Sequence, residues 1–358
     1  MKLFQKLLTL VVACTAAATI FTQAGGLPRN LIAADAKWVI YADLERLRAS
    51  QTGQFLEKRF LTEAYQELGQ NMKFDAAALS KRFKSLVAYG NEFKAGGPGP
   101  GGLPASVLII QADKEAQTIL TGALAAQVLA TDTNSPVKQL QSSPYPLYAI
   151  GKDLCAALHP DGVITLGKSR ERIEEATEVR AKKRPSLAGT QTFNDFPSTL
   201  DGFFLIAAAE GFADQLPFPA QARVLQMSDG ARIALDESSD RLKLELSIKG
   251  KNAEVVTQIQ QVAQGMVALF TMGQPEDADL AELVKSTRVK ATEKVVSIGI
   301  DFPVNKALAR LEESENKEKA PAKVKVKKQK RKARAESADK PAAPASPEKP
   351  EAPAAEAK

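Results

Sequence analysis

The stretch Trp38-Val39-Ile40-Tyr41-Ala42-Asp43 is an apolar run that ends in an acid, and residues 44–60 after it repeat apolar positions at helical spacing. The run is rich in β-branched and aromatic residues and has the length of a strand. The same unit recurs where residues 107–113 precede residues 114–129. Looser copies are residues 203–210 and residues 295–301, the latter before a helical stretch at 304–311. The repeated unit predicts a fold in which strands turn directly into helices.

Each copy of this unit ends in an acid: Asp43, Asp113, Glu210 and Asp301. A carboxylate at the start of a helix accepts hydrogen bonds from the free N–H groups of the first turn and suits the positive end of the helix dipole. We therefore interpret these acids as helix caps. A shared catalytic cluster of carboxylates is the competing interpretation.

Turn signals between the units predict antiparallel pairing. Residues 154–158 and 163–166 are separated by His159-Pro160-Asp161-Gly162, which is turn chemistry. Three alternating stretches, 223–227, 231–235 and 242–248, with turns at 228–230 and 236–240, predict a meander with one wet face. A long helix at 252–272 follows. Its predicted apolar stripe is Val255, Val256, Ile259, Val262, Ala263, Met266, Val267 and Phe270.

The mixture of helices and strands without strict alternation predicts the α+β class. A charged helix that begins at Ser169 ends at Lys182-Lys183-Arg184-Pro185, and a turn-rich stretch to Pro197 follows, which suggests a boundary. We expect two similar halves, 25–185 and 186–316, each with its own largely antiparallel or mixed sheet covered by helices. Residues 96–102 contain only Gly and Pro and predict a flexible loop.

The N-terminus has the pattern of an export signal. Lys2 and Lys6 precede an apolar run at 7–21, and Thr22-Gln23-Ala24 offers small residues to a signal peptidase. Residues 1–24 are thus predicted to be removed, and the mature protein to be periplasmic, envelope-associated or secreted, without a transmembrane span. The alternative is lipoprotein processing at Val11-Val12-Ala13-Cys14 with acylation of Cys14, although the chain stays apolar after that cysteine.

Positive charge is concentrated at the other end of the chain. Residues 317–358 contain thirteen Lys/Arg against six Asp/Glu, net +7, whereas the other 316 residues carry 35 against 36, net −1. The segment is also rich in Ala, Pro and Glu, a composition that cannot bury enough apolar surface to offset chain entropy. We therefore expect a disordered tail.

Polycations bind polyanions by releasing counterions, which needs no folded surface. The residues expected to do so are Lys323, Lys325, Lys327, Lys328, Lys330, Arg331, Lys332 and Arg334. Outside the cytoplasm their partners would be an anionic cell-envelope polymer or lipid headgroups. Two alternatives remain open: a nucleic-acid arm, and a solvated spacer that binds nothing specifically.

Residues 162–169 satisfy the phosphate-loop pattern of Gly, four residues and Gly-Lys-Ser. A true phosphate loop follows a strand and bends so that backbone N–H groups point at the anion. Here the four intervening residues, Val163 to Leu166, are themselves strand-like. We interpret the motif as a strand ending at a helix start, with Gly167 as the turn and Ser169 as the cap, and predict no nucleotide and no other cofactor.

The chain contains few residues that could support thiol, imidazole or metal chemistry. His159 is the one histidine, and Cys155 is the one cysteine left if Cys14 departs with the signal. If 154–159 is a strand, the two lie about 13 Å apart along it, so they cannot form a thiolate–imidazole pair. A Cys/His zinc site lacks ligands. We expect Cys155 to be a small buried residue and His159 a polar residue at a turn.

The overall pattern resembles uncharacterised families of exported bacterial proteins in which two α+β halves follow a signal peptide. The resemblance lies in residues 36–47, with strand, Ala-Asp and helix in sequence, and in residues 163–187, where a strand, Gly-Lys-Ser, a charged helix and Arg-Pro-Ser-Leu follow one another. It extends over most of residues 30–312 and does not include the tail. It implies an exported, non-enzymatic protein.

These observations predict a binding or scaffolding protein of the cell envelope with its basic tail as an electrostatic tether. The alternative from another class is an extracytoplasmic hydrolase that uses carboxylates, because two catalytic acids can be distant in the chain. Several acids gathered in one concave site would favour the hydrolase, whereas acids dispersed at helix starts would favour binding.

Overall fold

The structure is a computed structural model, and it describes most of the chain between residues 27 and 313. The described ranges are 27–62, 75–93, 106–129, 137–141, 144–151, 154–196, 202–213, 226–272 and 278–313. The export signal at 1–24, the Gly/Pro loop at 96–102, most of the strand expected at 223–227 and the tail at 317–358 lie outside these ranges. Their predictions stay predictions.

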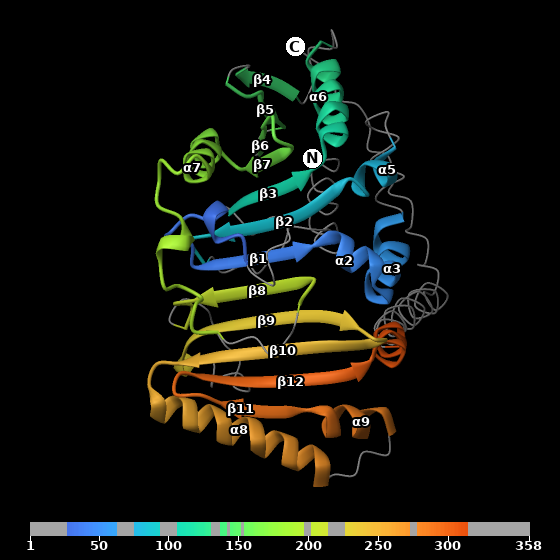
Figure 1. The fold of residues 1–358 in the computed structure, drawn as a ribbon, viewed down its shortest axis with the longest axis vertical. Helices are drawn as coiled ribbons and strands as arrows, with labels where there is room; N and C mark the ends of the chain where they lie inside the picture. The colour runs from blue at the N-terminus through green and yellow to red at the C-terminus, as the bar shows by residue number, and fades with distance from the viewer. Residues whose placement is uncertain are drawn as a thin grey trace, which may run out of the picture. The chain divides into compact units, whose positions relative to one another are not determined.

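One antiparallel sheet of twelve strands runs through the described part of the chain (Figure 1). In chain order the strands are β1 (Trp38–Asp43), β2 (Phe83–Gly90), β3 (Ser106–Ala112), β4 (Val137–Gln141), β5 (Leu147–Ile150), β6 (Leu154–Leu158), β7 (Val163–Gly167), β8 (Leu205–Glu210), β9 (Ser228–Ser238), β10 (Arg241–Gly250), β11 (Arg288–Ala291) and β12 (Val295–Pro303). In the sheet they follow the order β11-β12-β10-β9-β8-β1-β2-β3-β7-β6-β5-β4.

The predicted architecture of two halves with separate sheets is wrong. β1 pairs with β8, from Trp38 opposite Ala209 to Ala42 opposite Leu205, so the sheet is continuous from one half to the other. The physical reason is that β1 and β8 are apolar strands whose second edges would otherwise stay open, and each covers the other's edge. Nothing in the period of either strand reveals this pairing. The predicted domain boundary between residues 185 and 186 stays a prediction.

The two parts of the sheet nevertheless follow the same path. β1, β2 and β3 form a meander, and β7 then returns to pair with β3. β8, β9 and β10 form a second meander, and β12 returns to pair with β10. In both cases the first strand lies at the centre of the sheet, and at least one helix falls between the third strand and the returning one.

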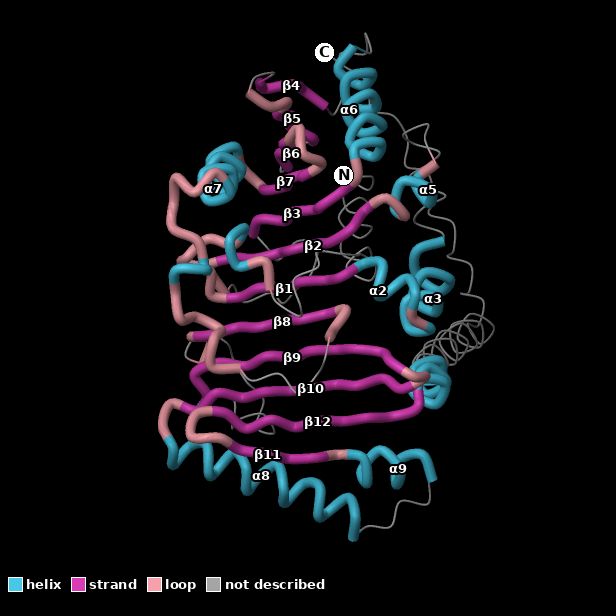
Figure 2. The backbone as a smooth tube through the Cα atoms, viewed as in Figure 1, coloured by secondary structure: helices cyan, strands magenta, loops and turns pink. Residues whose placement is uncertain are grey.

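Most helices follow the positions expected from the sequence (Figure 2). Their bounds are α2 (Leu44–Ala49), α3 (Gln51–Leu56), α5 (Ala76–Ser80), α6 (Lys114–Leu129), α7 (Arg170–Arg180), α8 (Ala253–Met272) and α9 (Ala278–Ser286). Shorter turns are η2 (Arg29–Leu31), the π-helical η3 (Glu57–Leu61) and η4 (Leu187–Gly189). The expected helix at 44–60 is interrupted at Ser50, whose hydroxyl caps α3 by accepting from the Gly53 N–H at 2.9 Å.

The two faces of the sheet are covered differently. On one face, called the helix-side face, Ala42, Leu86 and Ile110 pack with residues of α2, α5 and α6. Farther along that face α8 covers Ile248 and Val296. The opposite face is called the strap-side face, because residues 186–196, called the strap, contribute Leu187, Phe193 and Phe196 to its core.

The β9–β10 hairpin corrects one predicted turn. Residues 228–230, expected to be a turn, are the start of β9. The chain reverses at Ser239 and Asp240, inside the second predicted turn at 236–240, and their φ angles of 53° and 59° are both positive. Two positive φ angles are typical of the tight hairpin turn whose twist matches that of its strands. Glycine is the usual sequence signal of this turn, so Ser239-Asp240 does not reveal its conformation.

Polar contacts reinforce the seam between β1 and β8. The Glu237 carboxylate of β9 accepts hydrogen bonds from the backbone N–H groups of Gln51 at 2.7 Å and Thr52 at 2.9 Å, so a residue of the second half caps α3 of the first. Beside it, Arg46 lies 3.3 Å from Asp236. The two halves are thus joined by backbone pairing and by ion contacts.

Candidate functional site

The predicted polyanion-binding residues, Lys323 to Arg334, lie outside the described residues. The structure therefore tests neither their conformation nor their partners. The candidate sites of the folded body are the acids at strand ends, the motif at 162–169, His159 and Cys155, a network of charges around Lys249, and the surface of α8.

Two of the four strand-end acids cap helices, as the sequence predicts. The Asp43 carboxylate accepts from the Arg46 N–H at 3.0 Å, and the Asp113 carboxylate accepts from the Ala116 N–H at 2.7 Å. Burial raises the pKa of Asp43 to about 6 despite these contacts. Desolvation also opposes ionisation of Asp113, but its hydrogen bonds from Ala116 and from Arg82 outweigh it and hold its pKa below the ordinary value.

The capping interpretation is wrong for the other two acids. Asp301 lies inside β12 and forms an ion pair with Arg241 of β10 at 2.6 Å. Glu210 ends β8 and binds Lys249 at 3.4 Å. Asp301 and Glu210 each end an apolar run, as Asp43 does. They differ from Asp43 only in the path of the chain that follows them.

The interpretation of the phosphate-loop pattern as a strand ending at a helix is confirmed. Val163–Gly167 is β7, and the Ser169 hydroxyl caps α7 by accepting from the Arg172 N–H. Gly162 has φ +85°, and a Cβ there would lie 2.4 Å from the Ala112 carbonyl oxygen, so the turn requires glycine. The residues between the two glycines lie in the sheet and form no cradle for an anion.

His159 is more deeply buried than a turn residue was expected to be, with 1% of its surface exposed. Its Nε2 lies 3.1 Å from the Thr165 hydroxyl, and its ring centroid lies 4.6 Å from that of Tyr145. Desolvation, with a further contribution from Arg180, lowers its pKa to about 4. Cys155 is buried as predicted, and burial raises its pKa. Both residues belong to the packing of the first half.

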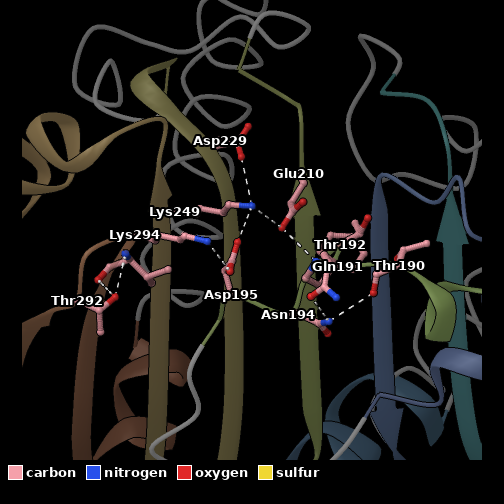
Figure 3. A network of polar contacts seen from close by, with 12 residues as sticks. Thr190, Gln191, Thr192, Asn194, Asp195, Glu210, Asp229, Lys249, Thr292 and Lys294 are labelled. Carbon is pink, nitrogen blue, oxygen red and sulfur yellow. Dashed lines mark hydrogen bonds and ion pairs between the residues drawn. The ribbon is translucent and has the colours of Figure 1, made fainter.

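A network of charges lies where β8, β9 and β10 meet the strap (Figure 3). The Lys249 Nζ lies 3.0 Å from Asp195, 3.3 Å from Asp229 and 3.4 Å from Glu210. Its side chain is only 16% exposed. Desolvation opposes its charge, but the hydrogen bond to Asp195 and the charges of Glu210 and Asp229 outweigh it and raise its pKa.

This network fastens the strap to the sheet. Asp195 belongs to the strap and also binds Lys294 at 3.3 Å. Glu210 accepts from the N–H of Phe193, a strap residue held at φ 62°. The three acids here meet two lysines, which offset all but one of their charges. Within the described ranges no group of His, Cys, Asp and Glu could hold a metal ion. The arrangement is suited to holding a segment in place.

Arg29 fixes the strap from its other side. Its guanidinium donates to the carbonyl oxygens of Leu187 at 2.7 Å, Thr192 at 2.8 Å and Thr190 at 2.9 Å. The Leu187 N–H also donates to Ile32 at 2.8 Å. A stretch that looked like a turn-rich linker in the sequence is therefore a fixed cover of the strap-side face.

An ion pair lies under this cover. Arg232 of β9 and Glu245 of β10 are 3.7 Å apart, with side chains 8% and 2% exposed. Arg232 also donates to the Phe196 carbonyl oxygen at 3.2 Å. Burial lowers the pKa of Arg232 against the opposing effect of Glu245. The pair is far too enclosed to meet a ligand without movement of the strap.

The surface of α8 is different in character from these charged sites. Exposed large apolar side chains gather on it: Val262, Met266, Leu269, Phe270 and Met272. Val262, Met266 and Phe270 belong to the apolar stripe predicted from the sequence, and the structure leaves them exposed to solvent. The helical period identified the face, but how far the sheet extends beneath it could not be deduced from the period.

Comparisons with known proteins provide no family and no function. No protein-family model and no curated protein matches the sequence. Among solved structures, crystal form III of a protein named TP0453 is similar over 80% of this chain and 98% of its own, with 8% identity and a TM-score of 0.44. Crystal form I is similar over 82% and 99%, with a TM-score of 0.42. Likeness at this level identifies neither a relative nor an activity.

Proposed function

We propose that this chain is an exported protein of the cell envelope that acts by binding or scaffolding, with its basic tail as an electrostatic tether. The observation that carries the proposal is the separation of charge: net +7 in residues 317–358 against net −1 in the rest of the chain. The partners of this tether are anionic lipid headgroups or an acidic envelope polymer.

The described residues support a tether that lies in the tail and not in the body, because many charged side chains of the body form ion pairs with one another. Arg82 binds Asp113 at 3.0 Å and Glu115 at 2.7 Å. Lys306 binds Asp279 and Glu282 at 2.9 Å and 2.6 Å. Pairs of this kind at the surface are individually weak, but their opposite charges cancel locally and leave little net field to attract a polyanion.

The rival proposal, a hydrolase that uses carboxylates, receives less support. Asp43 and Asp113 are engaged at separate helix starts. Where three acids do converge, at Asp195, Glu210 and Asp229, a lysine ammonium occupies the space between them. Paired catalytic acids flank the scissile bond and leave room between them for substrate and water, whereas in this group a salt bridge fills that space.

Salt-dependent cosedimentation of the mature protein tests the tether. The ligands are anionic vesicles, purified cell-wall polymer and DNA, each with the full chain, a chain lacking 317–358, and a chain of unchanged length in which the eight basic residues of 323–334 are Gln. We expect tail-dependent binding that falls at least tenfold between about 50 and 200 mM salt, and equal loss in both variants.

The Gln variant separates charge from length. Binding that survives in it but not in the truncated chain would make the tail a spacer, and binding to DNA alone would favour the nucleic-acid arm. If the three proteins bind every ligand equally, the tether is wrong.

A further inference from the structure

The fully buried side chains of α8 all lie in its first eleven residues, although the helix also contacts α9. They are Val256, Ile259 and Ala263, of which Val256 and Ile259 pack with Ile248 and Val296 of the sheet. Beyond Ala263 no residue of the helix is fully buried. Figure 1 shows the helix lying beside β11, the edge strand, with its C-terminal end leading away from the strands. The last two turns are therefore presented to solvent rather than used in the core.

Large apolar side chains are exposed on these turns and immediately before them, from Val262 onward. Exposed fractions are 46% for Val262, 50% for Met266, 71% for Leu269, 56% for Phe270 and 80% for Met272. Positions 262, 266, 269 and 270 recur at the spacing of one helix face. A contiguous apolar surface of this kind marks an interaction site, whereas isolated exposed apolar residues need no explanation.

After Glu254 in its first turn, the same helix is free of charge. Between Glu254 and Glu276 the sequence contains no Asp, Glu, Lys, Arg or His, and its polar positions are Gln and Thr. Loss of water therefore costs this surface no ionic desolvation. Among the described residues, no helix is long and apolar enough to cross a membrane.

We propose that the C-terminal half of α8 is a lipid-binding surface that inserts its exposed face into the headgroup–acyl boundary of an anionic bilayer. Leu269 and Phe270 form its centre. An interfacial helix buries its apolar face by roughly 5–10 Å, and electrostatic attraction to anionic lipid is a second signal that strengthens its binding. The inference rests on the proposed function, because that second signal is the basic tail, and it narrows the partner from polyanions in general to lipid.

Charge complementarity favours lipid over a second copy of this chain. Each copy carries its own tail of net +7. A dimer formed through α8 would bring two such tails onto one particle, which like-charge repulsion opposes, whereas an anionic bilayer neutralises the tail while it receives the helix.

The test uses the mature full-length chain and vesicles of phosphatidylcholine with phosphatidylglycerol. The variant is Leu269→Ser with Phe270→Ser, and its matched control is Leu129→Ser with Leu140→Ser, two residues that are 80% and 43% exposed in the first half. We expect at least a tenfold loss of vesicle affinity in the α8 variant, no loss in the control, and unchanged binding of both to DNA and cell-wall polymer. Unchanged thermal unfolding shows that each variant is folded.

A second readout locates the helix directly. In Phe270→Trp, tryptophan fluorescence should shift to the blue with vesicles and be quenched by brominated lipids, beyond the response of the parent, whose one tryptophan is Trp38. Parental affinity in the serine variant, together with no quenching beyond that of the parent in Phe270→Trp, overturns the inference and leaves the tail proposal standing. If only the chain that lacks 317–358 loses vesicle affinity, the inference is overturned in the same way.

The reverse result separates the two proposals in the other direction. If the serine variant loses vesicle binding and the tail-less chain does not, the α8 surface stands and the tether fails. Sedimentation velocity tests whether a second copy of this chain binds the α8 surface. If the protein is a dimer and the dimer disappears in the serine variant while vesicle binding is unaffected, the surface serves self-association and the proposal of a lipid partner is wrong.

Discussion

The strap-side face of the sheet is built in two ways. In the first half its central positions are Val39, Tyr89 and Val107, which are apolar. The same register row continues through Ala208 to Arg232, Ser247 and Ser297 in the second half, all at most 9% exposed. The first region is stabilised by burial of apolar area, whereas the second depends on partners for polar groups that have lost water. Equal burial thus rests on different interactions.

The sharpest test of this contrast is the ion pair of the second half. Glu245→Ala leaves the Arg232 guanidinium enclosed without its carboxylate, and the free energy of unfolding should fall by about 3–5 kcal/mol. Urea unfolding measures it. The double variant Arg232→Met with Glu245→Leu replaces the pair with apolar groups and should recover most of that loss. A double variant no better than Glu245→Ala would show that the pair contributes more than its charges.

In the first half, the comparable buried titratable group is His159. Its folded-state pKa of about 4 lies below the ordinary value of 6.5. Between these two pH values His159 is protonated in the unfolded chain and neutral in the folded chain. The free energy of unfolding therefore falls as pH falls from about 6.5 toward 4. The expected loss is about 3 kcal/mol. His159→Gln should remove most of this loss between pH 7 and pH 4, measured by urea unfolding at each pH. An identical pH dependence in both proteins would contradict it.

The Lys249 network offers an intermediate effect. Lys249→Met removes the charge shared by Asp195, Glu210 and Asp229, and the free energy of unfolding should fall by about 2 kcal/mol. Lys294→Met is the control, since this lysine is 65% exposed and its pair with Asp195 is worth less than about 1 kcal/mol. Hydrogen exchange of strap amides should quicken only in Lys249→Met. Equal effects of the two would mean that the strap does not depend on this contact.

The smallest effect compares two acids at matching junctions of the first half. Asp43 titrates near 6 and Asp113 has a pKa below its ordinary value. As pH falls from about 6 to 4, protonation of Asp43 therefore favours the folded state, while protonation of Asp113, at lower pH, disfavours it. NMR titration of the two side-chain carboxyl groups measures the order directly. Coincident midpoints would contradict it.

The sequence predicted individual elements better than their assembly. The strand at β1, the hairpin of β6 and β7, and the long helix α8 follow from period and turn residues. These signals act over a few residues, and the sequence therefore contains them. The pairing of β1 with β8 joins positions 38 and 209, and no local period reports which of two apolar edges will meet.

The candidate sites show the same limit. Asp43 and Asp301 both end apolar runs, yet one caps a helix and the other pairs across strands. The alternation in β9 predicts a wet face at polar positions such as Arg232, whereas the strap covers this residue. Conversely, α8 carries a full apolar stripe of which half has no cover among the described residues. In each case the deciding fact is what another segment places above the residue.

The central position of β1 also constrains how the molecule is made. Synthesis proceeds from the N-terminus, so β1 and β2 can pair early, while the other edge of β1 must wait for Leu205–Glu210. An apolar strand with an open edge is a site where a second nascent chain can add. Closure of that edge joins residues far apart in sequence, a contact that forms slowly because a long loop must close first. The interval before β8 arrives is thus the period in which this chain most needs a chaperone.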